Sequence, residues 1–154
     1  MFNSGPEVEK IFLSRTDALN PLASYSKYSF ELDDAEWPSL EHYYQGMKFE
    51  DPEIREQVRN APDPSGAARL AGQHKKKIRK DWRKLKQTYM TRGAYIRCRT
   101  HPEVARALLQ TADSIIVESS QFDYFWGCGR DGRGDNVFGR ILMEVRERIK
   151  SEIL

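Results

Sequence analysis

The sequence is poor in the residues that mark disulfide-bonded, metal-binding or membrane proteins. It holds two cysteines, Cys98 and Cys128, without CxxC spacing, so we expect free thiols in a reducing compartment. Three scattered histidines add too few ligands for a zinc site. No segment approaches the roughly 18 apolar residues of a membrane span, and residues 1–10 lack the apolar core of a signal peptide. We therefore expect a cytoplasmic protein without a metal, cofactor or membrane partner.

The chain also lacks internal repeats, low-complexity tracts and a large excess of one charge. Its 154 residues are 39% hydrophobic and 31% charged, with a formal net charge of +2. This length and composition favour one globular domain over residues 1–154, with residues 1–9 expected to be disordered. The small net charge excludes a general polycation, so any preference for anions must come from local clusters.

Hydrophobic periodicity and turn signals predict a mostly helical chain. Pro38 and Ser39 mark the start of a helix whose stripe of Leu40, Tyr44 and Met47 is typical of core residues. The expected strands are residues 10–13, 25–32 and 115–117, with a turn at 33–34. Four helices are expected to begin near residues 38, 51, 63 and 102, and two more to span residues 78–98 and 138–149. The fold class predicted is α+β, a mostly helical domain with a small β-sheet.

Glu41, Gln45 and Lys48 lie at i, i+4 and i+7 of the first predicted helix and so share one of its faces. A carboxylate and an amine held this close can act together, since the carboxylate moves protons and the amine binds an anion or attacks a carbonyl carbon. The ordinary alternative is a solvated polar edge with weak helix pairs, which spacing alone favours.

Residues 123–127, Asp-Tyr-Phe-Trp-Gly, follow a predicted strand and surround one carboxylate with aromatic rings. Phe125 and Trp126 could stack on a base or sugar, with Asp123 at the edge of the pocket. The pattern is equally typical of an aromatic cluster beneath a loop, with Asp123 as a turn residue.

The run from Gly127 to Gly132 formally matches GxGxxG, but the 22 residues after it are too few for a Rossmann unit. A glycine-rich loop before a helix that starts near Asn136 can still offer backbone N–H groups to an anion. A plain turn is the alternative.

Residues 75–86 carry eight lysines and arginines and one aspartate. Such a run attracts phosphate groups of a small ligand or of a nucleic acid, or it is simply a solvated helix face.

Four segments, residues 37–49, 79–90, 101–111 and 117–146, resemble the motifs of the NADAR family, also called YbiA-like, in the same order. The first, WPSLEHYYQGMKF, is similar to the family signature, and the resemblance spans residues 22–149. It implies a YbiA-like α+β fold and an N-glycosidase that hydrolyses the bond between a base and a phosphorylated ribose. Its substrates would be ribosylamino-pyrimidine phosphates of riboflavin biosynthesis or ADP-ribose on guanine in DNA or RNA.

The family chemistry implied is a lysine that captures the anomeric carbon of ribose as a Schiff base. Carried onto this chain, the resemblance implies Lys48 as that lysine, with Glu41 as proton-transfer partner and Asp123 as a third catalytic residue. The substrate-binding residues implied are Trp126, Trp82, Tyr44, Gln45, Ser24, Gly127 and Asn136. Burial beside Tyr44 and Trp126 would lower the pKa of Lys48, whereas Glu41 would raise it.

Three positions depart from the family pattern. Ser24 stands where the family has Asn, Ala71-Gly72 stands where it has Gly-Arg, and Arg97-Cys98 stands where it has Lys-Phe. An arginine cannot form a Schiff base, so the assignment of Lys48 fails if the essential lysine of the family lies at the position of Arg97.

Two alternatives remain beside the enzyme: a non-catalytic module that binds ADP-ribose or NAD, and a nucleic-acid-binding protein without catalysis. Together Glu41, Lys48, Asp123 and Trp126 favour catalysis, since a binding module needs no paired acid and amine.

Overall fold

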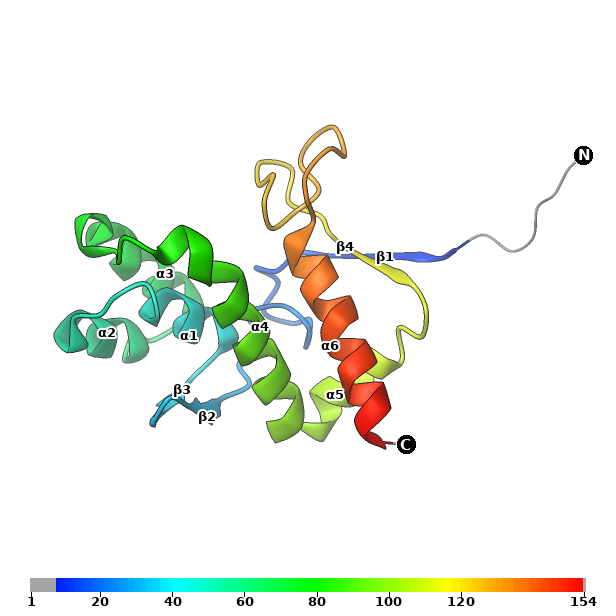
Figure 1. The fold of residues 1–154 in the computed structure, drawn as a ribbon, viewed down its shortest axis with the longest axis horizontal. Coiled ribbons are helices and arrows are strands. Elements are labelled where there is room, and N and C mark those ends of the chain that lie inside the picture. Colours follow the sequence, from blue (N-terminus) through cyan, green and yellow to red (C-terminus); the bar gives the residue numbers. More distant parts are fainter. Residues whose placement is uncertain (1–7, 154) are drawn as a thin grey trace, which may run out of the picture.

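The structure is a computed structural model that describes residues 8–153 (Figure 1). Most of the segment expected to be disordered, residues 1–7, lies outside the described residues, as does residue 154. The described part contains four strands, six α-helices and one short 3-10 helix, which confirms the predicted α+β class. In order they are β1 (Lys10–Leu13), β2 (Phe30–Leu32), β3 (Ala35–Trp37), α1 (Leu40–Gly46), α2 (Pro52–Arg59), α3 (Pro64–Gln73), the 3-10 helix (Lys75–Lys77), α4 (Trp82–Thr100), α5 (Pro102–Leu109), β4 (Ile115–Glu118) and α6 (Val137–Ile153).

The first three helices begin where their capping residues predict. Ser39, Asp51 and Asp63 are the N-cap residues of α1, α2 and α3, and each side chain accepts a backbone N–H from the first turn. Pro52 and Pro64 follow as first-turn residues, where a missing N–H costs nothing. The expected starts are confirmed.

Helix α4 begins at Trp82, later than its hydrophobic pattern suggests. The N–H of Arg79 donates to the C=O of Lys48 at 2.8 Å, which ties the segment before α4 to the end of α1. Gly93 does not interrupt the helix. A Cβ at Gly93 would lie 2.6 Å from Leu40 Cδ1, so this glycine is where α1 packs closely on α4.

The strand expected over Tyr25–Leu32 is wrong for its first half. Local turns take up the backbone there, because the N–H of Ser26 donates to the C=O of Ala23 and the N–H of Tyr28 to the C=O of Ser26. Only the last three residues pair, as β2.

The small sheet expected is in fact two separate two-stranded sheets within residues 8–153. β1 pairs in parallel with β4, from Lys10 opposite Ile115 to Leu13 opposite Glu118. β2 and β3 form an antiparallel hairpin, and its turn at Asp33–Asp34 is confirmed by φ angles of 53° and 63°.

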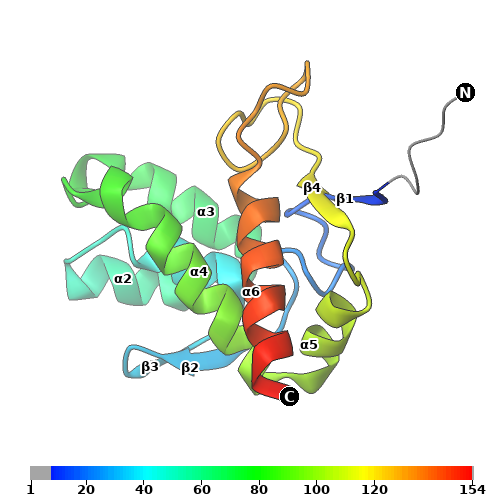
Figure 2. The same cartoon turned by 45° about the vertical axis from the view of Figure 1, so that its right-hand side comes forward.

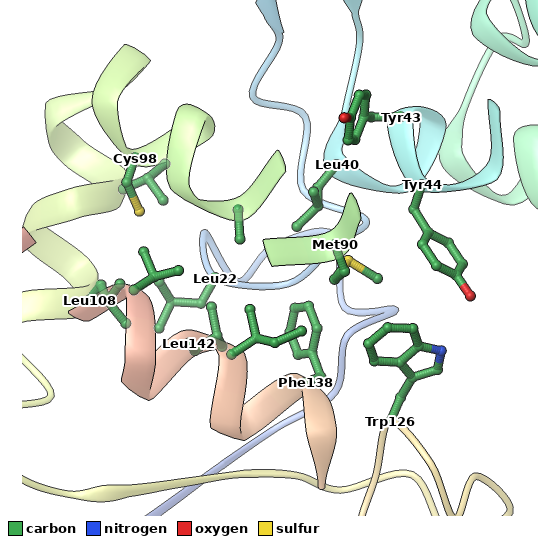
Figure 3. Packing of buried hydrophobic residues seen from close by; sticks show 14 of the residues in the cluster. Leu22, Leu40, Tyr43, Tyr44, Met90, Cys98, Leu108, Trp126, Phe138 and Leu142 are labelled. Carbon is green, nitrogen blue, oxygen red and sulfur yellow. The ribbon is translucent and has the colours of Figure 1, made fainter. Parts of the chain in front are cut away.

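The main core lies between α1, α4 and α6. Figure 2 shows α4 and α6 side by side. Leu40, Tyr44 and Met47 belong to this core, as their helical spacing predicts. Figure 3 shows Leu40 and Tyr44 within it. A smaller core around Phe49 and Val58 lies beneath α2 and α3. Both cysteines are free, and no helix of the described part is long and apolar enough to cross a membrane.

Candidate active site

Glu41, on the first turn of α1, is a fully buried carboxylate at the centre of the candidate site. Its Oε1 accepts hydrogen bonds from Ser24 Oγ at 2.8 Å and from Arg15 Nη1 at 2.6 Å, and its Oε2 accepts one from Gln45 Nε2 at 2.7 Å. Three donors on two oxygens is the bonding of a carboxylate anion, and the cation of Arg15 offsets the cost of burying it. The alternative of a solvated edge is therefore wrong for Glu41 and Gln45.

Arg15, just after β1, is a site residue that the sequence did not reveal. Its backbone N–H donates to Glu118 Oε2 at 2.8 Å, and this fully buried carboxylate also accepts from the N–H and Oγ of Ser120 at 3.0 and 2.9 Å. Arg15 and Glu118 are 103 residues apart, so no local pattern links them. Only the parallel pairing of β1 with β4 brings them together.

Lys48, two residues after the end of α1, places its amine 5.3 Å from the centre of the Tyr44 ring. Burial lowers the pKa of Lys48, the nearby Glu41 carboxylate opposes that change, and the cations Arg15 and Lys86 lower it further. The net result is a pKa below the ordinary lysine value, so more of this amine is neutral near pH 7 than in a free lysine.

Tyr44, Trp82 and Trp126 form an aromatic wall beside Lys48. The ring centres of Tyr44 and Trp82 are 5.3 Å apart, and those of Tyr44 and Trp126 are 5.4 Å apart at 89°. Figure 3 shows Tyr44 of α1 facing Trp126 of the loop after β4. Burial raises the pKa of Tyr44 to about 12, so its hydroxyl stays protonated at neutral pH. Lys86 Nζ adds a cation 3.8 Å from the centre of the Phe125 ring.

Asp123 supports this wall from within the loop. Its Oδ1 accepts the N–H groups of Phe125 and Trp126 at 3.0 and 2.8 Å, which fixes the turn that presents the indole. Its charge also acts on Arg15, so the carboxylate lies in the same region as the Arg15–Glu41 pair. Asp123 is thus a turn residue located beside the site.

Asn136 and Gly127 hold the end of β4. Asn136 Oδ1 accepts the N–H of Glu118 at 2.8 Å, and its Nδ2 donates to the C=O of Ile116 at 2.9 Å. Gly127 packs so closely on Glu118 that a Cβ would overlap Oε1 of the carboxylate. Both residues therefore have contacts that shape the loop.

The backbone amides of residues 134–138 donate to carbonyls of residues 124–128 at 2.6–3.1 Å. These amides include those of Val137 and Phe138 at the start of α6, so they are not free for an anion, and the plain turn describes this loop better than an anion site. The reason is that the loop folds back on itself, which no residue in the glycine run indicates.

Arg97 has a completely buried side chain that holds the loop containing Ser24. Its Nη1 donates to the C=O of Ala23 at 2.6 Å and its Nη2 to the C=O of Leu22 at 3.0 Å. Burial lowers the pKa of Arg97 to about 10. This guanidinium has no surface that a substrate can reach.

The basic run of residues 75–86 is mostly the solvated surface that its charge pattern indicates. All its cations up to residue 84 except Arg79 are exposed, whereas Lys86 is half-buried against Phe125.

A hollow of about 560 Å³ between α4, α6 and β2 is lined by Lys84, Arg92 and Arg148 but by none of the predicted site residues. Side-chain chemistry rather than cavity size therefore points to the region around Lys48. Within residues 8–153, no group of three or more His, Cys, Asp or Glu side chains is placed to hold a metal ion.

Comparison with known proteins gives consistent matches over almost the whole chain. The NADAR domain profile matches residues 1–150. N-glycosidase YbiA of Escherichia coli (strain K12) is 34% identical over 141 residues, which cover 92% of this chain and 88% of that protein. A riboflavin biosynthesis protein of Vibrio vulnificus (strain YJ016) is 38% identical over 129 residues, covering 84% of this chain and 35% of that protein.

The NMR structure of the E. coli protein YbiA has a TM-score of 0.84 with this fold at 32% identity, covering 96% of this chain and 89% of that one. The expectation of a hydrolase that acts on N-glycosyl compounds is confirmed at the level of these relatives by the name N-glycosidase. On its profile match, its sequence identity and its fold, the chain belongs to the NADAR family.

Proposed function

We propose that the chain, with residues 1–154 as one domain, is an N-glycosidase that hydrolyses the bond between a base and a phosphorylated ribose. The observation that carries this proposal is the half-buried amine of Lys48, which has a lowered pKa and lies beside the Glu41 carboxylate and an aromatic wall. A neutral amine can attack an anomeric carbon, and a fixed anion stabilises the positive charge that this carbon develops. The names of the relatives support the type of bond cleaved.

In the proposed mechanism, neutral Lys48 Nζ attacks C1 of the ribose while the bond from C1 to the base breaks. The base leaves with the bonding electrons and takes up a proton. Nζ then loses one proton, the bond from C1 to the ring oxygen opens, and the remaining Nζ proton passes to that oxygen, which leaves a Schiff base and a hydroxyl group. Water adds to C1, the C1–Nζ bond breaks, and ribose and free amine result. One water molecule is consumed per turnover.

The hydrogen bonds of Glu41 favour a role through its charge. Three of the roughly four acceptor positions on its two oxygens are already used by Ser24, Gln45 and Arg15, which leaves one position on Oε2 for a proton. Oε1 of Gln45 is buried and has no hydrogen-bond partner among residues 8–153, so an unused acceptor lies next to Glu41.

The other predicted residues are proposed to shape the pocket. Trp126, Trp82 and Tyr44 supply ring faces for the base and sugar. Asp123 orients Trp126 through its turn, while Gly127 and Asn136 support the loop from behind.

Two substrate classes fit this proposal: ribosylamino-pyrimidine phosphates of riboflavin biosynthesis, and ADP-ribose attached to guanine in DNA or RNA. The riboflavin biosynthesis protein among the relatives supports the first class. A lowered amine pKa favours catalysis over the alternative of a module that only binds ADP-ribose or NAD, because binding requires no neutral amine.

The test is a base-release assay on four compounds in parallel: a ribosylamino-pyrimidine phosphate, an oligonucleotide with ADP-ribosylated guanine, NAD and ADP-ribose. We expect release of the base from at least one of the first two, and no release by a Lys48→Met variant purified in the same way. Binding of ADP-ribose without release of base from any compound contradicts the proposal and favours the binding module.

A further inference from the structure

The guanidinium of Arg15 has one nitrogen engaged by the protein and an opposite edge that is open. Nη1 donates to Glu41 Oε1 at 2.6 Å and to Ser24 Oγ at 3.2 Å. Among the described residues, neither Nη2 nor Nε has a hydrogen-bond partner, and neither is among the fully buried polar atoms. The side chain is 15% exposed. The edge formed by these two nitrogens is therefore accessible.

The backbone of Arg15 is held on both sides. Its N–H donates to the buried carboxylate of Glu118, and its C=O accepts from the N–H of Tyr25 at 3.1 Å. Because backbone and Nη1 are both fixed, the open edge is oriented before any ligand arrives. Such preorganisation lowers the entropy cost of binding.

Arg15 lies among the charged groups of the candidate site. Its charge and that of Lys86 both act on Lys48, while Glu41 and Asp123 act on Arg15. Carboxylates offset much of this positive charge, but Glu41 is bonded only to Nη1 of Arg15, so the edge formed by Nη2 and Nε stays available to an anion. The planar fork of a guanidinium matches the oxygens of a phosphate group.

We propose that the open edge of Arg15 binds the phosphate group of the substrate and thereby sets the position of the sugar relative to Lys48. The identification of the ligand as a ribose phosphate rests on the proposed function. Arg15 is then a substrate-binding residue, and Glu118 is a positioning residue that acts through the Arg15 backbone.

The test compares the affinities of ribose 5-phosphate and ribose by titration calorimetry. Arg15→Lys keeps a cation for Glu41 but has no second edge, so we expect it to bind ribose 5-phosphate roughly ten- to a hundredfold more weakly and ribose as before. Arg59→Gln removes an arginine of α2 that pairs with Glu56, and we expect it to change neither affinity. Arg15→Gln also removes the cation from buried Glu41, so its melting temperature is measured beside its affinity.

A folded Arg15→Lys protein with the wild-type preference for ribose 5-phosphate overturns the proposal, as does a wild-type protein without such a preference. Other outcomes test the proposed glycosidase function independently of the phosphate site. A wild-type protein that releases no base, but whose phosphate preference depends on Arg15, refutes the glycosidase and keeps the phosphate site. An active enzyme in which Arg15→Lys keeps the wild-type ratio of kcat/KM for phosphorylated over dephosphorylated substrate refutes the phosphate site alone.

Discussion

Arg97 is a buried cation that hydrogen-bonds to backbone carbonyls, and among the described residues no carboxylate pairs with it. It holds Leu22 and Ala23, and it also donates to Ser26 Oγ at 3.2 Å. The loop it holds contains Ser24, which orients the Glu41 carboxylate. A residue without any surface for substrate therefore contributes to the geometry of the candidate site.

Arg97→Met should destabilise the protein and reduce its activity. The substitution leaves the buried C=O of Leu22 unpaired, at a cost of about 1–3 kcal/mol, removes one donor from the C=O of Ala23, and frees the Ser24 loop. Arg97→Lys keeps the charge and part of the bonding, so its loss should be smaller. Urea unfolding gives the stability, and kcat/KM gives the activity. A Met variant with wild-type stability would show that these hydrogen bonds contribute little.

The sequence was sufficient for the residues that share one helix face and insufficient for their partners. Helical spacing places Glu41, Gln45 and Lys48 together because all three depend on local geometry. Arg15 and Glu118 depend on the pairing of strands at opposite ends of the chain, which periodicity cannot reveal. Asn136 looks like a ligand residue in sequence, but tertiary contacts use both of its polar atoms.

At the scale of elements, the position of α1 depends on its close contact with α4 at Gly93. This packing accompanies the contact of Tyr44 of α1 with Trp82 at the start of α4, whose ring centres are 5.3 Å apart. Capping signals predicted α1, α2 and α3 well because they act within one turn. The start of α4 and the first half of the 25–32 segment were mispredicted because hydrogen bonds to distant or turn residues override their hydrophobic patterns.

Gly93→Ala should destabilise the fold by about 1–3 kcal/mol, although alanine is the better helix former. Its Cβ would lie 2.6 Å from Leu40 Cδ1 and 2.9 Å from the Tyr43 ring, so α1 and α4 must move apart. Gly72→Ala in α3 is the matched control, since nothing lies within 4 Å of its Cβ, and we expect it to stabilise by up to about 1 kcal/mol. Thermal unfolding measures both. Equal effects of the two substitutions would exclude close packing at Gly93.

For the whole molecule, the candidate site depends on segments that are distant in sequence. The loop after β1 supplies Arg15, α1 supplies Glu41, and the loop after β4 supplies Trp126. That second loop projects beyond the start of α6 in both ribbon views (Figures 1 and 2). The parallel pairing of β1 and β4 therefore joins the two halves of the site.

Trp126→Ala should weaken substrate binding by about 1–3 kcal/mol if its indole stacks on the base. Phe122→Ala is a control in the same loop, because its ring is 87% exposed and should contribute little. Kinetic constants are measured together with circular dichroism, since Trp126 also belongs to the core. A folded Trp126→Ala enzyme with unchanged constants removes this residue from the site.

The central claim is that Lys48 forms a covalent bond to the ribose, and its most direct test is reductive trapping. Borohydride added during turnover reduces a Schiff base to a stable amine, and peptide mass spectrometry then locates the adduct. We expect the ribose adduct on Lys48, and we expect Lys48→Arg to keep its positive charge while losing both adduct and activity. A fully active Lys48→Arg enzyme would contradict the account and favour direct attack by water. An adduct on a different lysine would contradict the assignment to Lys48.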